Sequence, residues 1–326
     1  MPNQNVDLSN RVAIVTGAAG GLGKAYALAL AQRGAAVVVN DLGGDTRGQH
    51  GSSALAEEVA AQIISLGGRA IANADSVATK AGGDAITQAA LDHFGRIDIV
   101  VNNAGNQRNA LFEDLTEEDI ESVLAVHLKG AFFVTQPAYR WMKQHGYGRV
   151  IFTSSQSGVF GNPYRANYGA AKTGIIGLMR VLVQEAPPEI RINAIMPNAL
   201  GSRMGTPGEE RVDKDFIEKI MARGNAYADQ MSPEYCAALV AWLASEDCTM
   251  TGQTFSVLRG NFARVFSGRT SGWSSLKGQC PTPELLGENI PTISDPATWH
   301  EPESGIDEGD IATATLNAIY EGTSQS

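Results

Sequence analysis

The chain has 326 residues, of which 43% are hydrophobic and 18% are charged, and its formal net charge is −10. That length is enough to bury one large core or two modest ones. The apolar runs are strand-sized and stop well short of the roughly 20 residues that a membrane helix needs. The first ten residues lack the basic start and the apolar stretch of a signal peptide. We therefore expect a cytoplasmic globular protein with no membrane partner.

Cysteine and charge placement narrow the class further. Cys236, Cys248 and Cys280 have neither paired spacing nor metal-ligand spacing, so we expect reduced packing residues and no metal site. Residues 278–326 hold nine acidic residues and no Lys or Arg. A chain this acidic offers no broad basic surface for phosphates, so nucleic acid is not expected as a partner.

Short apolar, β-branched runs alternate with helix-length segments along most of the chain. This alternation predicts an α/β fold, a single doubly wound Rossmann domain with a central parallel sheet covered by helices on both faces. Ser232, Pro233 and Glu234 predict a helix start, with a capping Ser, a Pro at the first position and an acid in the first turn. The expected strands are Val12–Val15, Ala36–Asn40, Ala70–Ala74, Ile97–Val101, Val150–Thr153, Ile192–Met196 and Thr254–Leu258.

The alternation stops after Leu258, and the apolar residues beyond it are too sparse for a separate core. We therefore expect a Rossmann-type domain over residues 1–260 and a C-terminal extension over residues 261–326 that packs on the same domain. One helix is expected in the extension, near Asp310–Tyr320. Asn198–Met231 is irregular and polar, with a helical patch near Lys214–Arg223, and it follows a strand where ligands bind in such sheets.

A glycine-rich turn at Thr16–Gly23 lies between the first strand and a helical pattern, as a phosphate-binding turn requires. Its glycines let the backbone turn tightly and approach a pyrophosphate, while the helix N-terminus offers free N–H groups to that anion. The expected binding positions are Gly17, Gly21, Leu22 and Gly23.

Asp41 follows the second strand, 18 residues after Gly23. A carboxylate at this place accepts hydrogen bonds from the ribose hydroxyls of NAD and repels the 2′-phosphate of NADP. No Lys or Arg occurs at residues 18–20 to offset that repulsion. The sequence therefore predicts NAD as the cofactor, and the alternative is a turn aspartate that precedes Gly43 and Gly44.

Tyr168 and Lys172 are four residues apart, so on a helix their side chains share a face. A lysine ammonium beside a phenol favours the phenolate and lowers the Tyr pKa from about 10 towards working pH. Tyr168 is then a usable general acid/base for an alcohol proton, and Lys172 is placed to hold the nicotinamide ribose. Ser155, thirteen residues before Tyr168 at the end of a strand, is expected to hydrogen-bond the substrate oxygen.

Together these motifs resemble those of the short-chain dehydrogenase/reductase family: TGxxxGxG at residues 16–23, NNAG at residues 102–105, Ser155, and YxxxK at residues 168–172. The resemblance covers roughly residues 9–260. It implies an NAD-dependent oxidoreductase that interconverts a secondary alcohol and a ketone, as a homodimer or homotetramer. NNAG is equally a strand-terminating turn. The further cofactor-site residues that the resemblance implies are Asp75 and Ser76 by the adenine, Asn103, Ala104 and Gly105, Tyr168 and Lys172, and Pro197, Ala199 and Ser202.

A narrower resemblance is to the (3R)-hydroxyacyl-CoA dehydrogenase domain of peroxisomal multifunctional enzyme type 2, also called 17β-hydroxysteroid dehydrogenase type 4. The stretches that carry it are VVVNDLGGD, ANADSV, GRIDIVVNNAG, VHLKGAFFVT and TSSQSGVFGNPYRANYGAAK. It implies a (3R)-3-hydroxyacyl-CoA substrate, including a steroid-derived one. The alternatives are a free hydroxysteroid, 3-oxoacyl-carrier-protein reduction, and an NAD-binding regulator without turnover. In MPNALGSRM, Leu200 stands as an extra residue relative to PNAGSRM.

His127 occupies the position at which most members of the broad family carry a fourth catalytic residue, an Asn. In those members it holds a water that links the lysine to bulk solvent. Imidazole donates and accepts hydrogen bonds, so a proton-relay role and a packed core histidine both remain open.

Basic residues outside the catalytic motifs are expected to include contacts to the phosphates of coenzyme A, which suit arginine clusters. For any one of them, the alternative is an ordinary surface or salt-bridge residue. The residues considered are Arg108, Arg203, Arg211, Arg259, Arg264, Arg269 and Lys277.

Overall fold

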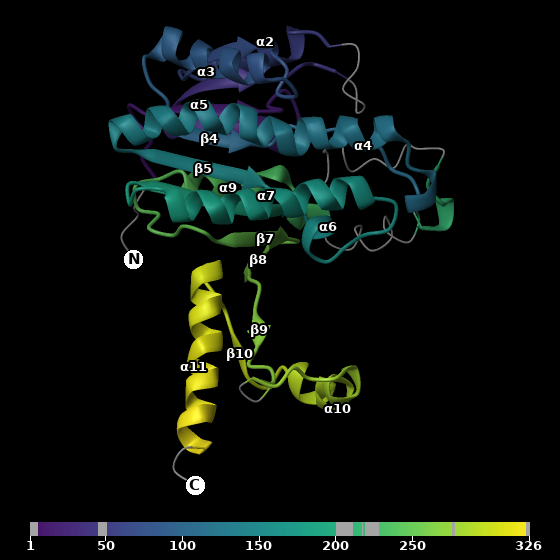
Figure 1. Ribbon diagram of the computed structural model, residues 1–326. Helices are drawn as coiled ribbons and strands as arrows, with labels where there is room; N and C mark the ends of the chain where they lie inside the picture. The colour runs from purple at the N-terminus through teal and green to yellow at the C-terminus, as the bar shows by residue number, and fades with distance from the viewer. Residues whose placement is uncertain are drawn as a thin grey trace. The chain divides into compact units, whose positions relative to one another are not determined.

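The computed structural model describes residues 6–44, 51–199, 211–216, 218, 228–275 and 278–323. The chain divides into two compact units, Met1–Arg264 and Val265–Ser326, so the division falls four residues after the expected boundary at residue 260. The first unit has a central sheet with helices on both faces (Figure 1). The expected doubly wound α/β fold is confirmed.

Eight strands form the sheet, in the order β3-β2-β1-β4-β5-β6-β7-β8. The neighbouring strands from β3 through β7 all pair in parallel. The order reverses direction between β1 and β4, which is where open α/β sheets place their ligand crevice. The strands are β1 (Val12–Thr16), β2 (Ala36–Asn40), β3 (Arg69–Asn73), β4 (Ile99–Asn102), β5 (Gly148–Thr153), β6 (Ile190–Asn198), β7 (Thr254–Leu258) and β8 (Asn261–Val265).

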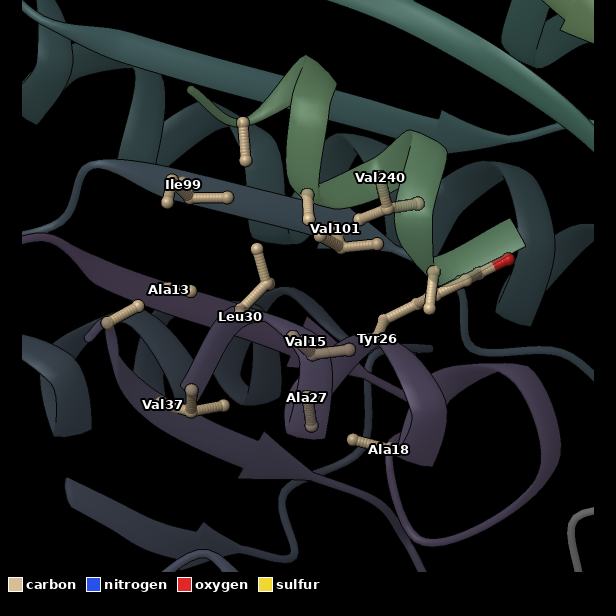
Figure 2. Packing of buried hydrophobic residues seen from close by; sticks show 14 of the residues in the cluster. Ala13, Val15, Ala18, Tyr26, Ala27, Leu30, Val37, Ile99, Val101 and Val240 are labelled. Carbon is tan, nitrogen blue, oxygen red and sulfur yellow. The ribbon is translucent and has the colours of Figure 1, made fainter. Parts of the chain in front are cut away.

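Two hydrophobic clusters cover the two faces of the sheet. On one face, α1 (Gly21–Ala31), α2 (Ala54–Ser65) and α9 (Pro233–Leu243) pack their apolar residues on the strands, and Figure 2 shows Leu30 and Val240 in this cluster. On the other face lie α3 (Lys80–Phe94), α5 (Gly130–His145) and α7 (Ala166–Glu185). Because both faces are covered, every residue of β1, β2, β4 and β5 is buried, which explains their continuous apolar runs.

Helix starts follow the local sequence. Ser232 accepts a hydrogen bond from the Glu234 N–H and Pro233 is the first residue of α9, as predicted. The shorter helices α4 (Glu117–Leu124) and α6 (Gln156–Val159) lie near the carboxyl ends of the strands. A π-helical turn, Ala125–Lys129, joins α4 to α5.

The alternation of strands and helices does stop after Leu258, but the sheet has one further strand that was not predicted. A two-residue turn at Arg259 and Gly260, with φ of 51° and 74°, leads into the eighth strand, β8. Two positive φ values in a two-residue loop define a type I′ hairpin, and Gly260 adopts such values without strain. Nearly all of β8 is exposed, so its residues show no buried stripe that the sequence could reveal.

The second unit contains more structure than expected. Besides α11 (Gly305–Thr323), which replaces the shorter helix expected at Asp310–Tyr320, it has α10 (Pro283–Ile293) and an antiparallel pair, β9 (Arg269–Thr270) with β10 (Trp299–His300). No residue with a described burial in this unit is fully buried, in line with its sparse apolar residues. Packing of this extension on the Rossmann unit stays a prediction. Among the described helices of both units, none is long and apolar enough to cross a membrane.

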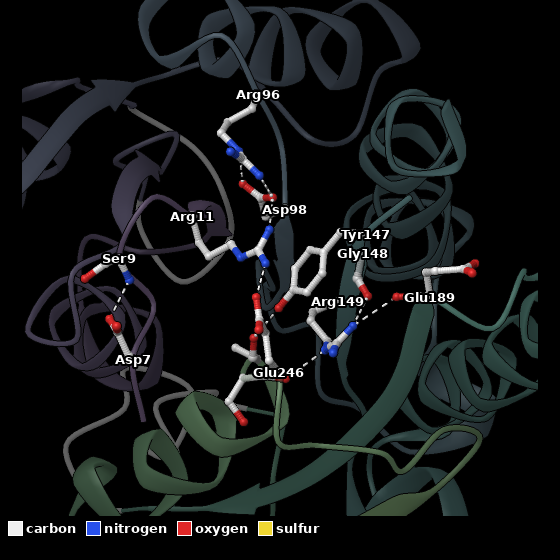
Figure 3. A network of polar contacts seen from close by, with 12 residues as sticks. Asp7, Ser9, Arg11, Arg96, Asp98, Tyr147, Gly148, Arg149, Glu189 and Glu246 are labelled. Atoms are coloured by element: carbon white, nitrogen blue, oxygen red, sulfur yellow. Dashed lines mark hydrogen bonds and ion pairs between the residues drawn. The ribbon is translucent and has the colours of Figure 1, made fainter. Parts of the chain in front are cut away.

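A polar network joins the amino ends of β1, β4 and β5 (Figure 3). The buried Asp98 carboxylate accepts hydrogen bonds from the Val12 N–H, at 2.8 Å, and from the guanidinium groups of Arg11 and Arg96. The Tyr147 ring lies 3.6 Å from the guanidinium carbon of Arg11, in cation–π contact. These charges lie at the edge of the sheet opposite to the carboxyl ends, so they belong to the scaffold.

Candidate active site

The predicted site residues gather at the carboxyl ends of adjacent strands. The glycine-rich turn follows β1, Asp41 follows β2, Asn103–Gly105 follow β4, and Ser155 follows β5. β1 pairs with both β2 and β4, and β5 is the next strand along the sheet. The topology therefore brings segments that are far apart in sequence to one crevice.

The glycine-rich turn fits a group that needs close backbone approach. Gly17 has a φ of 66°, and a Cβ there would lie 2.8 Å from the Ala104 Cα. A Cβ on Gly23 would lie 2.1 Å from the Gly17 carbonyl oxygen. The helix α1 begins next to this turn, where Gly20 caps it without a side-chain hydrogen bond. The N-terminal N–H groups of α1 are thus suited to a pyrophosphate.

The NNAG segment holds this turn in place. The Asn103 side-chain amide donates to the carbonyl oxygens of Thr16 at 3.0 Å and of Gly17 at 3.2 Å. The backbone N–H groups of Asn103 and Ala104 both donate to the Thr16 hydroxyl at 3.0 Å. The segment therefore serves as the structural turn after β4 that the sequence allowed. It lies at the place where the family resemblance predicts contacts to the cofactor.

Asp41 is tied to the same turn. Its carboxylate oxygens accept hydrogen bonds from the Ala19 N–H at 2.9 Å and from the Gly43 N–H at 2.7 Å. The turn role that the sequence left as the alternative for Asp41 is thus present, and the same bonds fix the carboxylate beside the glycine-rich turn, so the predicted contact to a ribose stays a prediction.

Asp75 follows β3, next along the edge from Asp41. The Asn73 side chain accepts a hydrogen bond from the Asp75 N–H at 3.1 Å and donates one to the Asp75 carboxylate at 2.7 Å. Asn40 in turn donates to the Asn73 side-chain oxygen at 2.8 Å. Ser76 is half-buried beside them. This arrangement holds an exposed carboxylate at the outer end of the crevice.

Ser155, Tyr168 and Lys172 come together as predicted. Ser155 caps α6, and its side chain lies close enough to the Tyr168 phenol to lower the pKa of that group. The Lys172 ammonium is buried, donates to the Thr153 carbonyl oxygen at 2.6 Å, and lies 5.5 Å from the centroid of the Tyr168 ring. Burial lowers the pKa of Lys172 to about 7.

The expected lowering of the Tyr168 pKa by Lys172 is not found. Burial raises the pKa of Tyr168 above its usual value, and this outweighs the opposite effects of the Ser155 hydroxyl and the Arg165 guanidinium. The Lys172 ammonium is directed at the Thr153 carbonyl oxygen. The phenol is therefore protonated at neutral pH in this state of the protein.

His127 lies in the π-helical turn, packed edge-on against Tyr168 with ring centroids 5.0 Å apart. Its Nε2 atom is 2.9 Å from the Asn106 carbonyl oxygen and 3.1 Å from the Asn106 backbone nitrogen. Burial, followed by the charge of Lys172, holds the pKa of His127 well below its usual value, so the ring is neutral. Its Nδ1 atom is buried without a hydrogen-bond partner. A Cβ on Gly105 would lie 2.4 Å from the His127 Cε1 atom.

A small cavity lies between His127 and Lys172. Thr16, Asn102 and Ala104 also line it, and it has room for about one water molecule. The cavity is lined by polar residues from four elements, and a buried water requires such partners.

Other predicted residues have mixed outcomes. Pro197 is in β6 and Ala199 follows it, whereas Ser202 and Arg203 lie outside the described residues. Arg108 does not fit the coenzyme A contact considered for it. Its side chain is only 5% exposed and its Nε atom lies 4.0 Å from the Asp119 carboxylate, so it faces the protein interior.

Several buried polar residues near the site were not predicted. Asn106, Gln107 and Asn109 flank Arg108 directly after NNAG, and all are buried. Asn167, next to Tyr168, is buried as well. Four consecutive polar residues after a buried strand are unusual, and this run is the signal that would have indicated a buried polar cluster.

A phosphate-binding turn, a fixed carboxylate after β2 and a Ser–Tyr–Lys group at one crevice define a dinucleotide-dependent oxidoreductase site on a Rossmann fold. The sequence matches the family described as "short chain dehydrogenase" over residues 11–213. The chain belongs to this family and is an oxidoreductase that acts on CH–OH groups. Fold and family together imply a nicotinamide cofactor and a small-molecule substrate.

The narrower resemblance is also confirmed. The chain is 44% identical to peroxisomal multifunctional enzyme type 2 of Mus musculus over 304 residues, which are 91% of this chain and 39% of that protein. It matches the structure of the full-length Drosophila melanogaster enzyme with a TM-score of 0.76 and 29% identity, over 97% of this chain and 51% of that one. It is 37% identical to the 3-oxoacyl-[acyl-carrier-protein] reductase of Synechocystis sp., over 77% of this chain and 96% of that protein. The chain thus spans less than two thirds of the multifunctional relatives.

Proposed function

We propose that this protein is an NAD-dependent dehydrogenase that interconverts a secondary alcohol and a ketone. The observation that carries the proposal is the grouping of Ser155, Tyr168 and the buried Lys172 beside a glycine turn that leaves no room for a Cβ. The preference for NAD rests on Asp41, whose carboxylate is fixed where the 2′-phosphate of NADP would carry like charge.

Each side chain has a defined task in the reaction. A nicotinamide cofactor held by the glycine-rich turn and Asp41 would supply or accept the hydride at the carbinol carbon of the substrate. Ser155 hydrogen-bonds the substrate oxygen and holds it against Tyr168. In the reductive direction the protonated Tyr168 hydroxyl donates its proton to the ketone oxygen, and in the oxidative direction the tyrosinate accepts the alcohol proton. Lys172, with a pKa of about 7, exchanges protons near neutral pH.

His127 belongs to a proton route in this proposal. A water in the small cavity between Lys172 and His127 would accept a hydrogen bond from the lysine. It would form a second hydrogen bond with the buried Nδ1 atom of His127, which lacks a protein partner. A neutral imidazole has one donor and one acceptor nitrogen, so it suits such a water. The same ring packs on Tyr168, so the packing role and the relay role are compatible.

The proposed substrate is a (3R)-3-hydroxyacyl-CoA. Support comes from the similarity to multifunctional enzymes, two of which are named hydratase-dehydrogenase-epimerase. The relative named 3-oxoacyl-[acyl-carrier-protein] reductase keeps the carrier-protein ester as a second candidate. Of the arginines considered for coenzyme A, Arg264 is exposed on β8, whereas Arg269 is paired with Glu308 at 3.6 Å in the second unit.

The test is turnover, followed as NADH formation at 340 nm. We expect oxidation of a (3R)-3-hydroxyacyl-CoA by the wild type, and a loss of about 10²–10⁴-fold in Tyr168→Phe with NAD binding retained. More than a tenth of wild-type activity in Tyr168→Phe contradicts the assigned role. Binding of NAD without turnover on any alcohol would favour the regulator.

Substrate choice is settled by comparing kcat/KM for the acyl-CoA, its pantetheine-truncated analogue, an acyl-carrier-protein ester and a free hydroxysteroid. Coenzyme A contacts predict that truncation costs at least about tenfold, or ~1.4 kcal/mol, and costs Arg264→Ala less. Faster oxidation of the free steroid than of any thioester would favour the steroid alternative.

Assembly and location complete the proposal. We expect a homodimer or homotetramer, and a monomer by light scattering at micromolar concentration would contradict this. The cytoplasmic location expected from the sequence also stays a prediction, and imaging of the tagged chain tests it against the peroxisomal location in the names of several relatives.

A further inference from the structure

A buried asparagine next to Tyr168 ties three segments together. The Asn167 side chain is 5% exposed, and its amide nitrogen donates to the Arg108 carbonyl oxygen at 3.0 Å and to the Asp119 carbonyl oxygen at 3.1 Å. Its side-chain oxygen accepts from the Tyr168 N–H at 2.7 Å. One amide thus joins the loop after β4, the first turn of α4 and the first turn of α7.

The two anchors of Asn167 are themselves held by charge. The Asp119 carboxylate closes the capping box of α4 with Thr116 and forms a pair of hydrogen bonds with the Arg211 guanidinium, at 2.9 and 3.2 Å. Arg211 and the capping hydrogen bonds hold the pKa of Asp119 well below its usual value, so it is ionised throughout the neutral range. Arg108 lies beside the same carboxylate in the interior.

The loop that receives the Asn167 bond also supports the ring of Tyr168. Asn106, in that loop, forms the hydrogen bond to His127, whose ring packs on the Tyr168 ring. The loop therefore constrains Tyr168 twice, through its backbone by way of Asn167 and through its ring by way of His127.

We propose that Asn167 is a positioning residue for the reaction, because it fixes the first turn of α7 and with it the distance from the Tyr168 hydroxyl to Ser155. The N–H groups in the first turn of a helix have no intrahelical acceptor, so an amide that accepts from the Tyr168 N–H and donates to two other segments fixes this turn. Misplacement of a catalytic group by about 1 Å costs up to about 10²-fold in rate. The inference rests on the proposed role of Tyr168.

Asn193 is a matched control for the structural part of this role. It is 1% exposed, its side-chain nitrogen donates to the Met250 carbonyl oxygen at 2.8 Å, and its oxygen accepts from the Gln253 N–H at 3.1 Å. Asn193 therefore bonds to backbone groups as Asn167 does. Its partners precede β7, so the bonds lie on the amino side of that strand, away from Tyr168.

The experiment compares Asn167→Asp with Asn193→Asp in the full chain. The substitution keeps the size of the side chain, while an ionised carboxylate loses both donors. For each variant, the thermal unfolding midpoint and the number of NADH-binding sites are measured first. KM for NAD and kcat are then measured with the alcohol that the wild type turns over fastest, and kcat is expressed per NADH-binding site. We expect Asn167→Asp to lower kcat at least tenfold, while its KM for NAD stays within about threefold of the wild-type value. We expect Asn193→Asp to lower the midpoint of thermal unfolding, while its kcat stays within about twofold of the wild-type value.

A kcat within twofold of wild type for Asn167→Asp would overturn the inference, as would equal losses in both variants. If Asn167→Asp does not fold, Asn167→Ala, which leaves space for water, is held to the same criteria. Tyr168→Phe in the same assay separates the two claims. If Tyr168→Phe is inactive and the Asn167 variant is fully active, only the positioning role is refuted. If Tyr168→Phe is active, the proposed function is refuted.

Discussion

A side chain larger than that of glycine at position 105 should clash with the ring of His127, so substitutions at these two positions should affect stability jointly. In the structure, a Cβ added to Gly105 would lie 2.4 Å from the His127 Cε1 atom and 3.2 Å from its Nε2 atom. Ordinary carbon contacts begin near 3.5 Å, so the ring has to move by about 1 Å. The ring is buried and its Nε2 atom is bonded to the Asn106 backbone at 2.9 Å, so a shift of that size breaks the hydrogen bond.

The expected cost of Gly105→Ala follows from these two effects. Overpacking of a well-packed interior costs about 1–3 kcal/mol. A buried hydrogen bond that is lost adds about 1 kcal/mol or more, and the reduced entropy of the unfolded chain offsets about 0.4–1 kcal/mol. We therefore expect Gly105→Ala to lower the free energy of unfolding by about 1–4 kcal/mol.

A double-mutant cycle with His127→Asn, measured by urea unfolding without cofactor, tests this reasoning. Asn has no atom at the place of Cε1, so Gly105→Ala should cost less than about 1 kcal/mol in that background. Gly177→Ala is the control, because that glycine lies inside α7 with nothing near its added Cβ, and it should stabilise by about 0.5–1 kcal/mol. An equal cost of Gly105→Ala in both backgrounds would refute the steric coupling.

Three further predictions concern charge. Asp41→Ala should reduce the ratio of kcat/KM for NAD over NADP at least about tenfold, and equal wild-type values for the two cofactors would contradict the role of Asp41. Asp119→Asn should destabilise the protein by about 2–4 kcal/mol near neutral pH, because it leaves the interior Arg108 charge unbalanced. The pKa of Asp119 is lowered by folding, so its stabilisation is present above about pH 4 and is lost as pH falls. Urea midpoints of Asp119→Asn should therefore fall less steeply in acid than those of the wild type. Lys172 shows the same direction of linkage in a higher pH window, since burial lowers its pKa to about 7 and so destabilises the charged form. Stability should rise from pH 7 towards pH 10 as folded Lys172 loses its proton first, and Lys172→Met should remove that rise.

The sheet could be predicted because burial on both faces leaves strands as continuous apolar runs. The seven expected strands all exist, and most of their ends are displaced by only one or two residues. β8 had no such signal, because its side chains are mostly exposed. The sequence does contain a signal for the start of α10 that was overlooked, because Thr282 is a capping residue and Pro283 is the first residue of the helix.

The site divides in the same way. The glycine turn, Asp41, Ser155, Tyr168 and Lys172 could be found because each motif has a fixed spacing along the chain. The Asn167 contacts could not, because the partners of one amide lie 59 and 48 residues away in sequence. The pKa of Tyr168 was predicted in the wrong direction, because spacing places a lysine nearby but says nothing of how deeply the phenol is buried.

The network at the amino ends of the strands has a consequence for how this sequence can change. Arg11, Asp98 and Tyr147 join the sheet at the edge away from the crevice, and none of them lies at the ends that carry the cofactor and catalytic residues. Substitutions there alter the stability margin while leaving the chemistry intact. Adaptation to a hotter or colder habitat can therefore proceed at the amino ends of the strands, while selection for a new substrate proceeds at their carboxyl ends.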